Sequence, residues 1–385
     1  MPQRLGSWLL ALLAATTGFA AVARADSIPV GVVAPLSGGG ADYGTAFQRG
    51  IQMAVDQINQ KGGIDLGGKP YTIAPIYCDD EFKPDKAVNC GKALSAQNGV
   101  AVVMTPSSLA AFPMMGFNQQ QGFVLLASSQ TPKFTQLGNK LVVRMTNNTD
   151  QTMLPWVDLL NGYFKTKDIA VNRVAVMVVN TELGKTWSDN FATVWKRRSG
   201  ASIVGSASYN ANDTDFYPQL STLLPKDPDA IVLTTVCQPS SIVIKQAREL
   251  GFKGLFIQSA ACSGEELSRL LAPDQVNGLI VEIGGWGLDK PAVTAFRKAF
   301  TDKYREAPQA IAGQGYDGLR YVVRAMELAG TGTDATKIRA AMPKALAETP
   351  NMFDMANLDE KGDVDFPMYV GVLADGKVAT FTGAK

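Results

Sequence analysis

Short apolar runs rich in β-branched residues alternate with stretches of helical periodicity along most of this chain. Residues 28–33 form one such run, and residues 44–61 follow with apolar side chains on one helical stripe, which ends at Gly62 and Gly63. A second series with the same plan begins at residues 174–179. This alternation is typical of βαβ units in a mostly parallel sheet. The predicted fold class is therefore α/β.

The chain is long enough for two such sheets, because its 385 residues exceed what one hydrophobic core usually organises. No low-complexity tract or long Pro/Gly-rich linker separates the two series, so we expect two lobes joined by short crossing segments, with a hinged cleft between them. The second lobe is expected to hold helices over 187–199 and 240–250. The late helices, over 291–304 and 316–328, are expected to return to the first lobe, and a last strand near 368–373 to the second.

Residues 1–25 have the features of a secretory signal peptide. Arg4 gives a positive start, residues 9–15 form a short apolar run, and residues 23–25 fit a small-x-small cleavage site before Asp26. The alternative, a membrane anchor, needs about 20 apolar residues, and threonine, glycine and arginine interrupt this stretch. We therefore expect export to the periplasm with cleavage of the signal peptide. No cysteine lies at the cleavage point to carry a lipid anchor.

The charge balance argues against two classes of partner. The whole chain has a net charge of +1, and removing residues 1–25 takes away Arg4 and Arg24 but no acidic residue, which leaves −1. Nucleic acids and anionic membranes usually demand a basic face. We therefore expect no nucleic-acid partner, and no later segment of the sequence approaches a membrane span.

The four cysteines, Cys78, Cys90, Cys237 and Cys262, are an even number in a chain expected to be exported, which favours disulfides over metal ligation. Cys78 follows a strand-like run and Cys90 lies in the helical stretch after it, while Cys237 and Cys262 each end an apolar run. The simplest pairing is therefore Cys78 with Cys90 and Cys237 with Cys262. Buried free thiols are the alternative.

The chain contains no histidine. This absence removes the usual general base, most zinc ligation and every Ser-His-Asp or Cys-His arrangement. We assign no catalytic residue and expect that the protein is not an enzyme.

Three near-motifs do not change this reading. Gly313-x-Gly315-x-x-Gly318 matches a dinucleotide fingerprint, but the residues before it are too few and too helix-like for the required strand. The segment 184–186 resembles the end of a P-loop whose first glycine is missing. The consecutive acids at 79–81 are typical of a solvated loop. We therefore predict no cofactor and no metal.

Ligands of open parallel sheets bind outside the carboxyl ends of the strands, so the strand-to-helix loops are the segments to inspect. In this chain those loops are rich in glycine, hydroxyl and amide residues, which suit a carboxylate or another strongly polar ligand group. They comprise residues 35–44, 105–108, 127–131, 237–241 and 259–264.

Several side chains in these loops are candidate ligand contacts. Ser107 and Ser108 follow a strand directly and could contact ligand, cap the next helix, or do both. Ser128, Ser129 and Gln130 repeat the arrangement after the next strand, and at least one of them should face the cleft.

Three aromatic residues also need an interpretation. Tyr43 lies in a glycine-rich loop and could flank the ligand or pack on the surface. For Trp187 and Trp286 we favour core packing over ligand contact.

In the order of these loops, the chain resembles the leucine/isoleucine/valine-binding protein family. The members of that family are type I periplasmic binding proteins. The resemblance spans nearly the whole chain after residue 27, although its individual motifs are short. It is carried by residues 28–38, Tyr43-Gly44, Arg49-Gly50, 54–59, 62–64, Asp79-Asp80, 84–88, Ser107-Ser108, Ser128-Ser129, Pro132, 246–248, Gly251, Tyr316-Asp317 and 359–363.

The resemblance implies two Rossmann-like lobes joined by a three-segment hinge and closing on one ligand. It assigns residues 26–146 and 285–348 to lobe 1 and residues 147–284 and 349–385 to lobe 2. The ligand-bound form would be recognised by the membrane permease of an ABC importer. We also expect a monomer.

By position, the family's first-lobe contacts with a ligand α-carboxylate and ammonium fall on Ser108, Ser128 and Gln130. Ser107 lies beside the first of these, and Gln130 replaces the family's usual threonine. Tyr43 matches the aromatic residue that covers the ligand.

The second lobe departs from the family pattern. Amino-acid binders place an acid in the loop where this chain has Ala260, Ala261 and Cys262, and Gln238 stands near an expected tyrosine. A buried ammonium without an acid would be costly. We therefore favour a neutral or carboxylate-bearing ligand, with an aromatic compound as one candidate. A branched-chain amino acid is the alternative ligand, and Glu282 or Glu182 could then pair with its ammonium. An exported sensory domain of the same fold is the alternative function.

Overall fold

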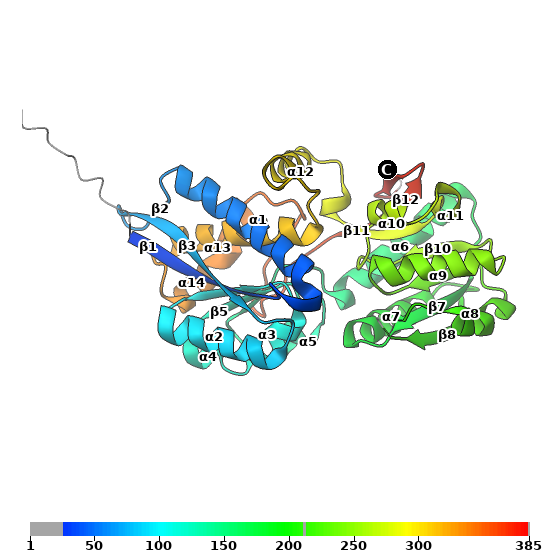
Figure 1. Cartoon of the computed structure of the whole chain (residues 1–385), viewed down its shortest axis with the longest axis horizontal. Helices are drawn as coiled ribbons and strands as arrows, with labels where there is room; N and C mark the ends of the chain where they lie inside the picture. Colours follow the sequence, from blue (N-terminus) through cyan, green and yellow to red (C-terminus); the bar gives the residue numbers. More distant parts are fainter. Residues whose placement is uncertain (1–25, 211–212, 384–385) are drawn as a thin grey trace, which may run out of the picture.

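The structure is a computed structural model that describes residues 26–210 and 213–383, so the expected signal peptide at 1–25 lies outside the described residues. Two β-sheets with helices on their faces lie side by side along the long axis (Figure 1). This arrangement confirms the predicted α/β fold with two lobes. We call the six-stranded sheet with its helices lobe 1 and the seven-stranded sheet with its helices lobe 2. Among the described residues, no helix is long and apolar enough to cross a membrane.

The sheet of lobe 1 has the strand order β2-β3-β1-β4-β5-β6, parallel except for the antiparallel β2–β3 pair. Its strands are β1 (Asp26–Ala34), β2 (Ile64–Asp65), β3 (Pro70–Asp79), β4 (Val102–Thr105), β5 (Val124–Ala127) and β6 (Val142–Arg144). Helices α1 (Ala41–Gln60) and α13 (Ala310–Ala329) pack together on one face, and α2 (Pro84–Asn98) and α3 (Ser108–Met115) on the other. The remaining helices of the lobe are α4 (Asn118–Gln121), α5 (Lys133–Gln136), α12 (Pro291–Tyr304) and α14 (Ala335–Glu348).

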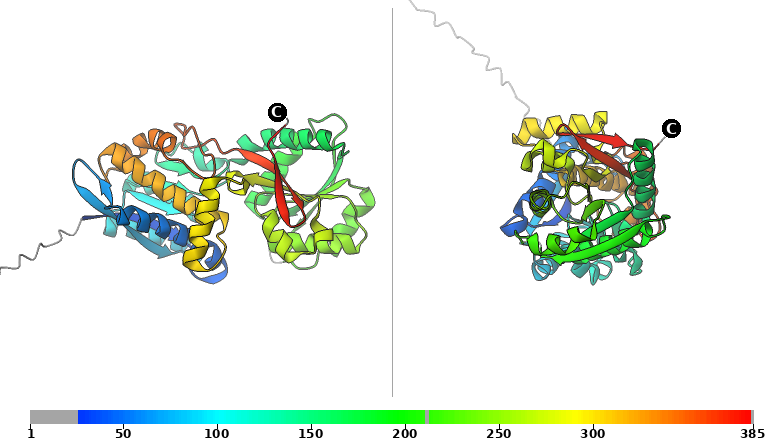
Figure 2. Two further views of the ribbon diagram at one scale, coloured as in Figure 1. Left: turned by 90° about the horizontal axis from the view of Figure 1, so that it is seen from above. Right: turned by 90° about the vertical axis from the view of Figure 1, so that its right-hand side faces the viewer.

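The sheet of lobe 2 has the strand order β13-β12-β11-β10-β9-β7-β8. The β11–β12 and β12–β13 pairs are antiparallel. Its strands are β7 (Arg173–Val179), β8 (Ser202–Tyr209), β9 (Ala230–Leu233), β10 (Leu255–Gln258), β11 (Ile280–Gly284), β12 (Met368–Ala374) and β13 (Lys377–Phe381). Its helices are α6 (Thr149–Lys167), α7 (Glu182–Trp195), α8 (Tyr217–Leu223), α9 (Cys237–Glu249), α10 (Gly264–Leu270) and α11 (Pro273–Val276). Figure 2 shows β12 and β13 on lobe 2, while α13 lies in lobe 1, as expected for the late segments.

Helix starts differ most from the sequence-based expectations. Helix α7 begins at Glu182 rather than 187, because the Thr181 hydroxyl accepts a hydrogen bond from the Gly184 N–H at 3.0 Å and caps the helix there. Helix α9 begins at Cys237 rather than 240, and α13 begins at Ala310 rather than 316. Strand β13 was not expected. The segment 184–186 therefore lies within α7 and not in a phosphate-binding loop.

The Gly313–Gly318 motif lies inside α13 and has a packing role. A Cβ at Gly313 would lie 2.6 Å from the Trp286 ring, so glycine leaves room for that side chain. The motif therefore has no strand before it and does not form a dinucleotide-binding turn.

Both predicted disulfides are present, Cys78–Cys90 and Cys237–Cys262. The first joins the end of β3 to α2. The second joins the first residue of α9 to the loop that follows β10.

Three segments cross between the lobes: β6 to α6, β11 to α12, and α14 to β12. The third crossing is held by side chains of lobe 1. The Asp317 carboxylate accepts a hydrogen bond from the Met352 N–H at 2.6 Å, and Arg339 donates to the Asp359 carbonyl at 3.0 Å. Burial raises the pKa of Asp317 to about 6. The exact boundaries of the lobes remain a prediction.

A buried ion pair joins the first and third crossings. Arg144, at the end of β6, donates from Nε to Asp363 in the third crossing at 2.7 Å, and both side chains are buried. The same carboxylate accepts hydrogen bonds from Asn148 in the first crossing at 2.7 Å and from Thr135 at 2.8 Å. Further guanidinium hydrogen bonds reach the carbonyls of Ser129 and Thr131. One cation therefore ties a loop of lobe 1 to two hinge segments.

Replacing Asp363 with Asn should lower the free energy of unfolding by about 3–5 kcal/mol, because the Arg144 guanidinium would be left buried without its counter-charge. Urea titration followed by circular dichroism measures this change. Asp302→Asn is the matched control, since Asp302 forms an exposed ion pair with Lys298, and should leave stability nearly unchanged. Equal effects of the two substitutions would contradict the role given to the buried pair.

Candidate ligand-binding cleft

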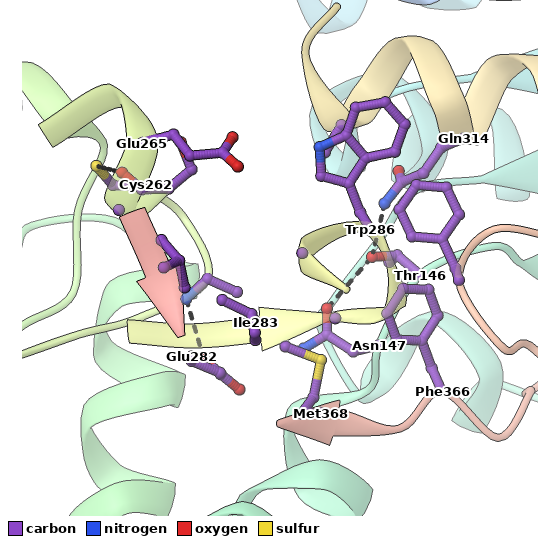
Figure 3. Close-up of a pocket in the computed structure, with 18 of the residues that line it drawn as sticks. Thr146, Asn147, Cys262, Glu265, Glu282, Ile283, Trp286, Gln314, Phe366 and Met368 are labelled. Atoms are coloured by element: carbon purple, nitrogen blue, oxygen red, sulfur yellow. Dashed lines mark hydrogen bonds between the residues drawn. The ribbon is translucent and has the colours of Figure 1, made fainter. Parts of the chain in front are cut away.

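A cavity of about 120 Å³ lies at the hinge between the lobes (Figure 3). Residues of both lobes and of all three crossings contribute to its walls. Its lining residues include Gln130, Thr146, Asn147 and Gln314 on the lobe 1 side, Ala260, Cys262, Ser263, Glu265 and Glu282 on the lobe 2 side, and Ile283, Trp286, Arg297, Phe353, Phe366 and Met368 around the hinge.

A chain of polar side chains runs along the lobe 1 wall. The Ser128 hydroxyl donates to Gln314 Oε1 at 2.6 Å, and Gln314 Nε2 donates to Thr146 Oγ1 at 3.5 Å. The Thr146 hydroxyl and Gln130 Nε2 both donate to Asn147 Oδ1, at 3.3 and 2.9 Å. Two of the dashed lines in Figure 3 mark the bonds made by Thr146. Neutral amides and hydroxyls arranged in this way can bind a carboxylate or another polar ligand group.

The other lobe 1 candidates lie behind this wall. Ser107 caps α3 by accepting a hydrogen bond from the Ala110 N–H at 3.3 Å, and Ser108 and Ser129 share a hydrogen bond of 2.8 Å. The Tyr43 hydroxyl donates to the Pro106 carbonyl at 3.2 Å, which places this partly exposed ring beside the same loop. The structure thus gathers these residues at one edge of the sheet, although the cavity lining includes Gln130 but neither Ser128 nor any of these four.

On the lobe 2 wall, Glu282 of β11 holds the loop that follows β10. Its carboxylate accepts hydrogen bonds from the Ala260 N–H and from Trp187 Nε1, each at 3.1 Å. Burial raises the pKa of Glu282 above its ordinary value, and the two N–H donors oppose that shift. Glu282 is thus an almost completely buried acid directly behind the loop in which the sequence has no acid.

Aromatic side chains form the hinge side of the cavity. The Trp286 ring stacks on Phe353 with 5.9 Å between centroids, and the Phe366 ring packs against Phe353 with 5.7 Å between centroids. Arg297 lies over Trp286 at 4.8 Å and donates to its carbonyl at 3.0 Å. Trp286 is thus largely buried, as the sequence suggested, yet it also lines the cavity. This wall can receive an apolar or aromatic ligand body.

Gln238 differs from the other candidates, because it lies exposed in the first turn of α9 and does not line the cavity. Sequence reasoning missed Gln314, Thr146 and Asn147. Gln314 offered only a weak signal, as an amide among small and apolar residues just before the helix expected over 316–328. Thr146 and Asn147 directly follow an apolar run, where ligand-binding side chains are usual in such sheets. Within the described residues, no group of three or more acidic or cysteine side chains is placed to hold a metal ion.

Comparisons with known proteins agree with this architecture. The sequence model of the periplasmic binding protein family matches residues 27–377. The chain is 26% identical to the Leu/Ile/Val-binding protein BraC3 of Rhizobium johnstonii, covering 92% of this chain and 94% of that protein. It is 25% identical to the leucine-, isoleucine-, valine-, threonine- and alanine-binding protein of Pseudomonas aeruginosa, covering 95% of each.

Solved structures share the fold. LivJ of Streptococcus pneumoniae, a branched-chain amino acid transporter substrate-binding protein solved with isoleucine, has a TM-score of 0.77 at 24% identity, covering 92% of this chain and 99% of LivJ. A solute-binding protein from R. palustris solved with benzoate has a TM-score of 0.72 at 18% identity, covering 93% and 96%. The family model matches nearly the whole described length of the chain, and the structure has two lobes with a cavity at the hinge. The chain therefore belongs to the periplasmic binding protein family.

Proposed function

We propose that this protein captures a small organic ligand between its two lobes in the periplasm and delivers it to the membrane permease of an ABC importer. The observation that carries the proposal is the hinge cavity, whose walls come from both lobes. A ligand that contacts both walls stabilises the closed form by its extra contacts, and no covalent step is needed. We accordingly propose a binding protein and not an enzyme.

The chemistry of the walls supports a ligand with a carboxylate or similar polar group and an apolar body. Ser128, Gln314 and Gln130 belong to the polar chain along lobe 1, and Trp286 and Phe366 provide apolar surface. We propose that Tyr43, Ser107, Ser108 and Ser129 join this contact set when the lobes close. Gln238 and Ala260 would approach from lobe 2.

A branched-chain amino acid is the second candidate ligand, and one contact favours it. Curated relatives are named for leucine, isoleucine and valine, and a ligand ammonium in such a protein requires a nearby acid. Glu282 supplies a buried carboxylate at the cavity, where it accepts a hydrogen bond from the Ala260 N–H. Leucine and benzoate therefore represent the two ligand classes to be compared.

Transport is supported over a sensory role because structural neighbours such as LivJ are described as transporter substrate-binding proteins. Export would require cleavage of the signal peptide proposed for residues 1–25. We propose that the protein acts as a monomer, since one chain supplies both walls of the cavity.

A thermal-shift screen of ligand-stripped protein should identify the ligand class, because a compound that binds only the folded state raises the melting temperature. The screen compares branched-chain amino acids, benzoate, short-chain acids and amides. We expect a saturable shift with at least one carboxylate-bearing compound. A largest shift with leucine or valine would assign an amino acid, and no shift with any compound would contradict the proposal.

Replacing Ser128 with Ala should weaken binding of that compound about tenfold, because the loss of one hydroxyl breaks the polar chain at Gln314. Isothermal titration calorimetry measures the dissociation constant. Ser95→Ala is the control, since the Ser95 hydroxyl of α2 donates to the Gly91 carbonyl of its own helix. An unchanged dissociation constant in the Ser128 variant would remove this loop from the proposed site.

A further inference from the structure

The loops that follow β9 and β10 of lobe 2 are neighbours at the carboxyl edge of the sheet. Strands β9 and β10 pair in parallel, with Leu233 opposite Gln258, so residues 234–236 and 259–263 emerge side by side. The second of these loops supplies Ala260, Cys262 and Ser263 to the cavity wall. Its conformation therefore determines part of the ligand site.

Hydrogen bonds hold these loops near the strand ends. Gln258 Nε2 donates to the Thr235 carbonyl at 2.8 Å, and the Ser240 hydroxyl donates to Gln258 Oε1 at 2.7 Å. Glu282 holds the Ala260 N–H at 3.1 Å. These bonds restrain the bases of the loops, whereas the start of α9 has no side-chain cap, since its N-cap residue is Val236.

The Cys237–Cys262 disulfide joins the loops beyond those hydrogen bonds. It links the first residue of α9 to the cavity-lining part of the second loop, with 4.8 Å between Cα atoms and each cysteine 3% exposed. Both sulfur atoms also lie near the Ser263 carbonyl, at 3.9 and 3.4 Å. The disulfide of lobe 1 differs, because neither Cys78 nor Cys90 lines the cavity.

We propose that the Cys237–Cys262 disulfide is a positioning device that holds the lobe 2 half of the ligand site in its binding geometry before ligand arrives. This inference rests on the function proposed above. A loop that is already ordered loses less conformational entropy on binding, so its preorganisation increases affinity. Cys237 and Cys262 are positioning residues in this account, and the ligand need not touch Cys237.

Hydrogen exchange measured by mass spectrometry tests the positioning role without any ligand. In a Cys237→Ala/Cys262→Val variant, amides of residues 259–264 should exchange about tenfold faster than in the wild type, while amides of lobe 1 remain unchanged. A Cys237→Ser/Cys262→Ser variant provides a second replacement should the apolar pair fold poorly. Unchanged exchange of this loop in a folded variant would overturn the proposal.

Calorimetry with L-leucine and benzoate as probes tests the effect on binding. For the probe that binds the wild type, the dissociation constant of the lobe 2 variant should be about tenfold higher, with the loss appearing in the binding entropy. A saturating concentration of that probe should restore the protection of residues 259–264 from exchange. The matched control, Cys78→Ala/Cys90→Val, should remain within about twofold of the wild type. Equal weakening in both variants would show a general loss of stability and overturn the positioning role.

The two proposals fail in different ways. If the wild type binds neither probe, leucine and benzoate are excluded as ligands, and the exchange measurement alone decides whether the disulfide orders the loop. If the wild type binds a probe and the lobe 2 variant binds it equally well, the function stands and the positioning role is wrong.

Discussion

The ion pair between Arg144 and Asp363 is the interaction on which the arrangement of the two lobes depends. Arg144 is completely buried, and a buried charge is tolerated only when it is paired and hydrogen-bonded. Its partners lie on the loop after β5 and on the third crossing, and Asn148 of the first crossing shares the same carboxylate. The proposed ligand loop and two hinge segments therefore meet at one polar centre, with little freedom to move independently.

A rigid scaffold can nevertheless support a cleft that opens and closes, because the motion takes place between the lobes and not within them. Each lobe has its own sheet covered by helices, and three short crossings connect them. Closure by rotation about such crossings leaves the interior of each lobe unchanged. The walls of the cavity then act as two prepared half-sites. Hydrogen-bonded amides and hydroxyls order the half in lobe 1, while Glu282 and the Cys237–Cys262 disulfide order the half in lobe 2.

The sequence predicted the features that depend on local pattern. The alternation of runs predicted the α/β fold. The even number of cysteines in a chain expected to be exported predicted disulfides, and the places of the cysteines along the chain predicted both pairings. Helix starts were less accurate, because the Thr181 cap extends α7 by a turn. The pairing of Arg144 with Asp363 could not be predicted, since 219 residues separate them and only the return of the chain through the hinge brings them together. Gln314 enters the cavity wall for the same reason, on a helix that returns to lobe 1.

Small-angle X-ray scattering with and without ligand tests the central claim most directly, which is that the lobes close on a bound molecule. The ligand is the compound that gives the largest thermal shift, added at saturating concentration. The account predicts that the radius of gyration falls on binding, because the lobes lie side by side along the long axis (Figure 1) and approach each other around the hinge. A radius of gyration that stays unchanged at saturation would contradict it.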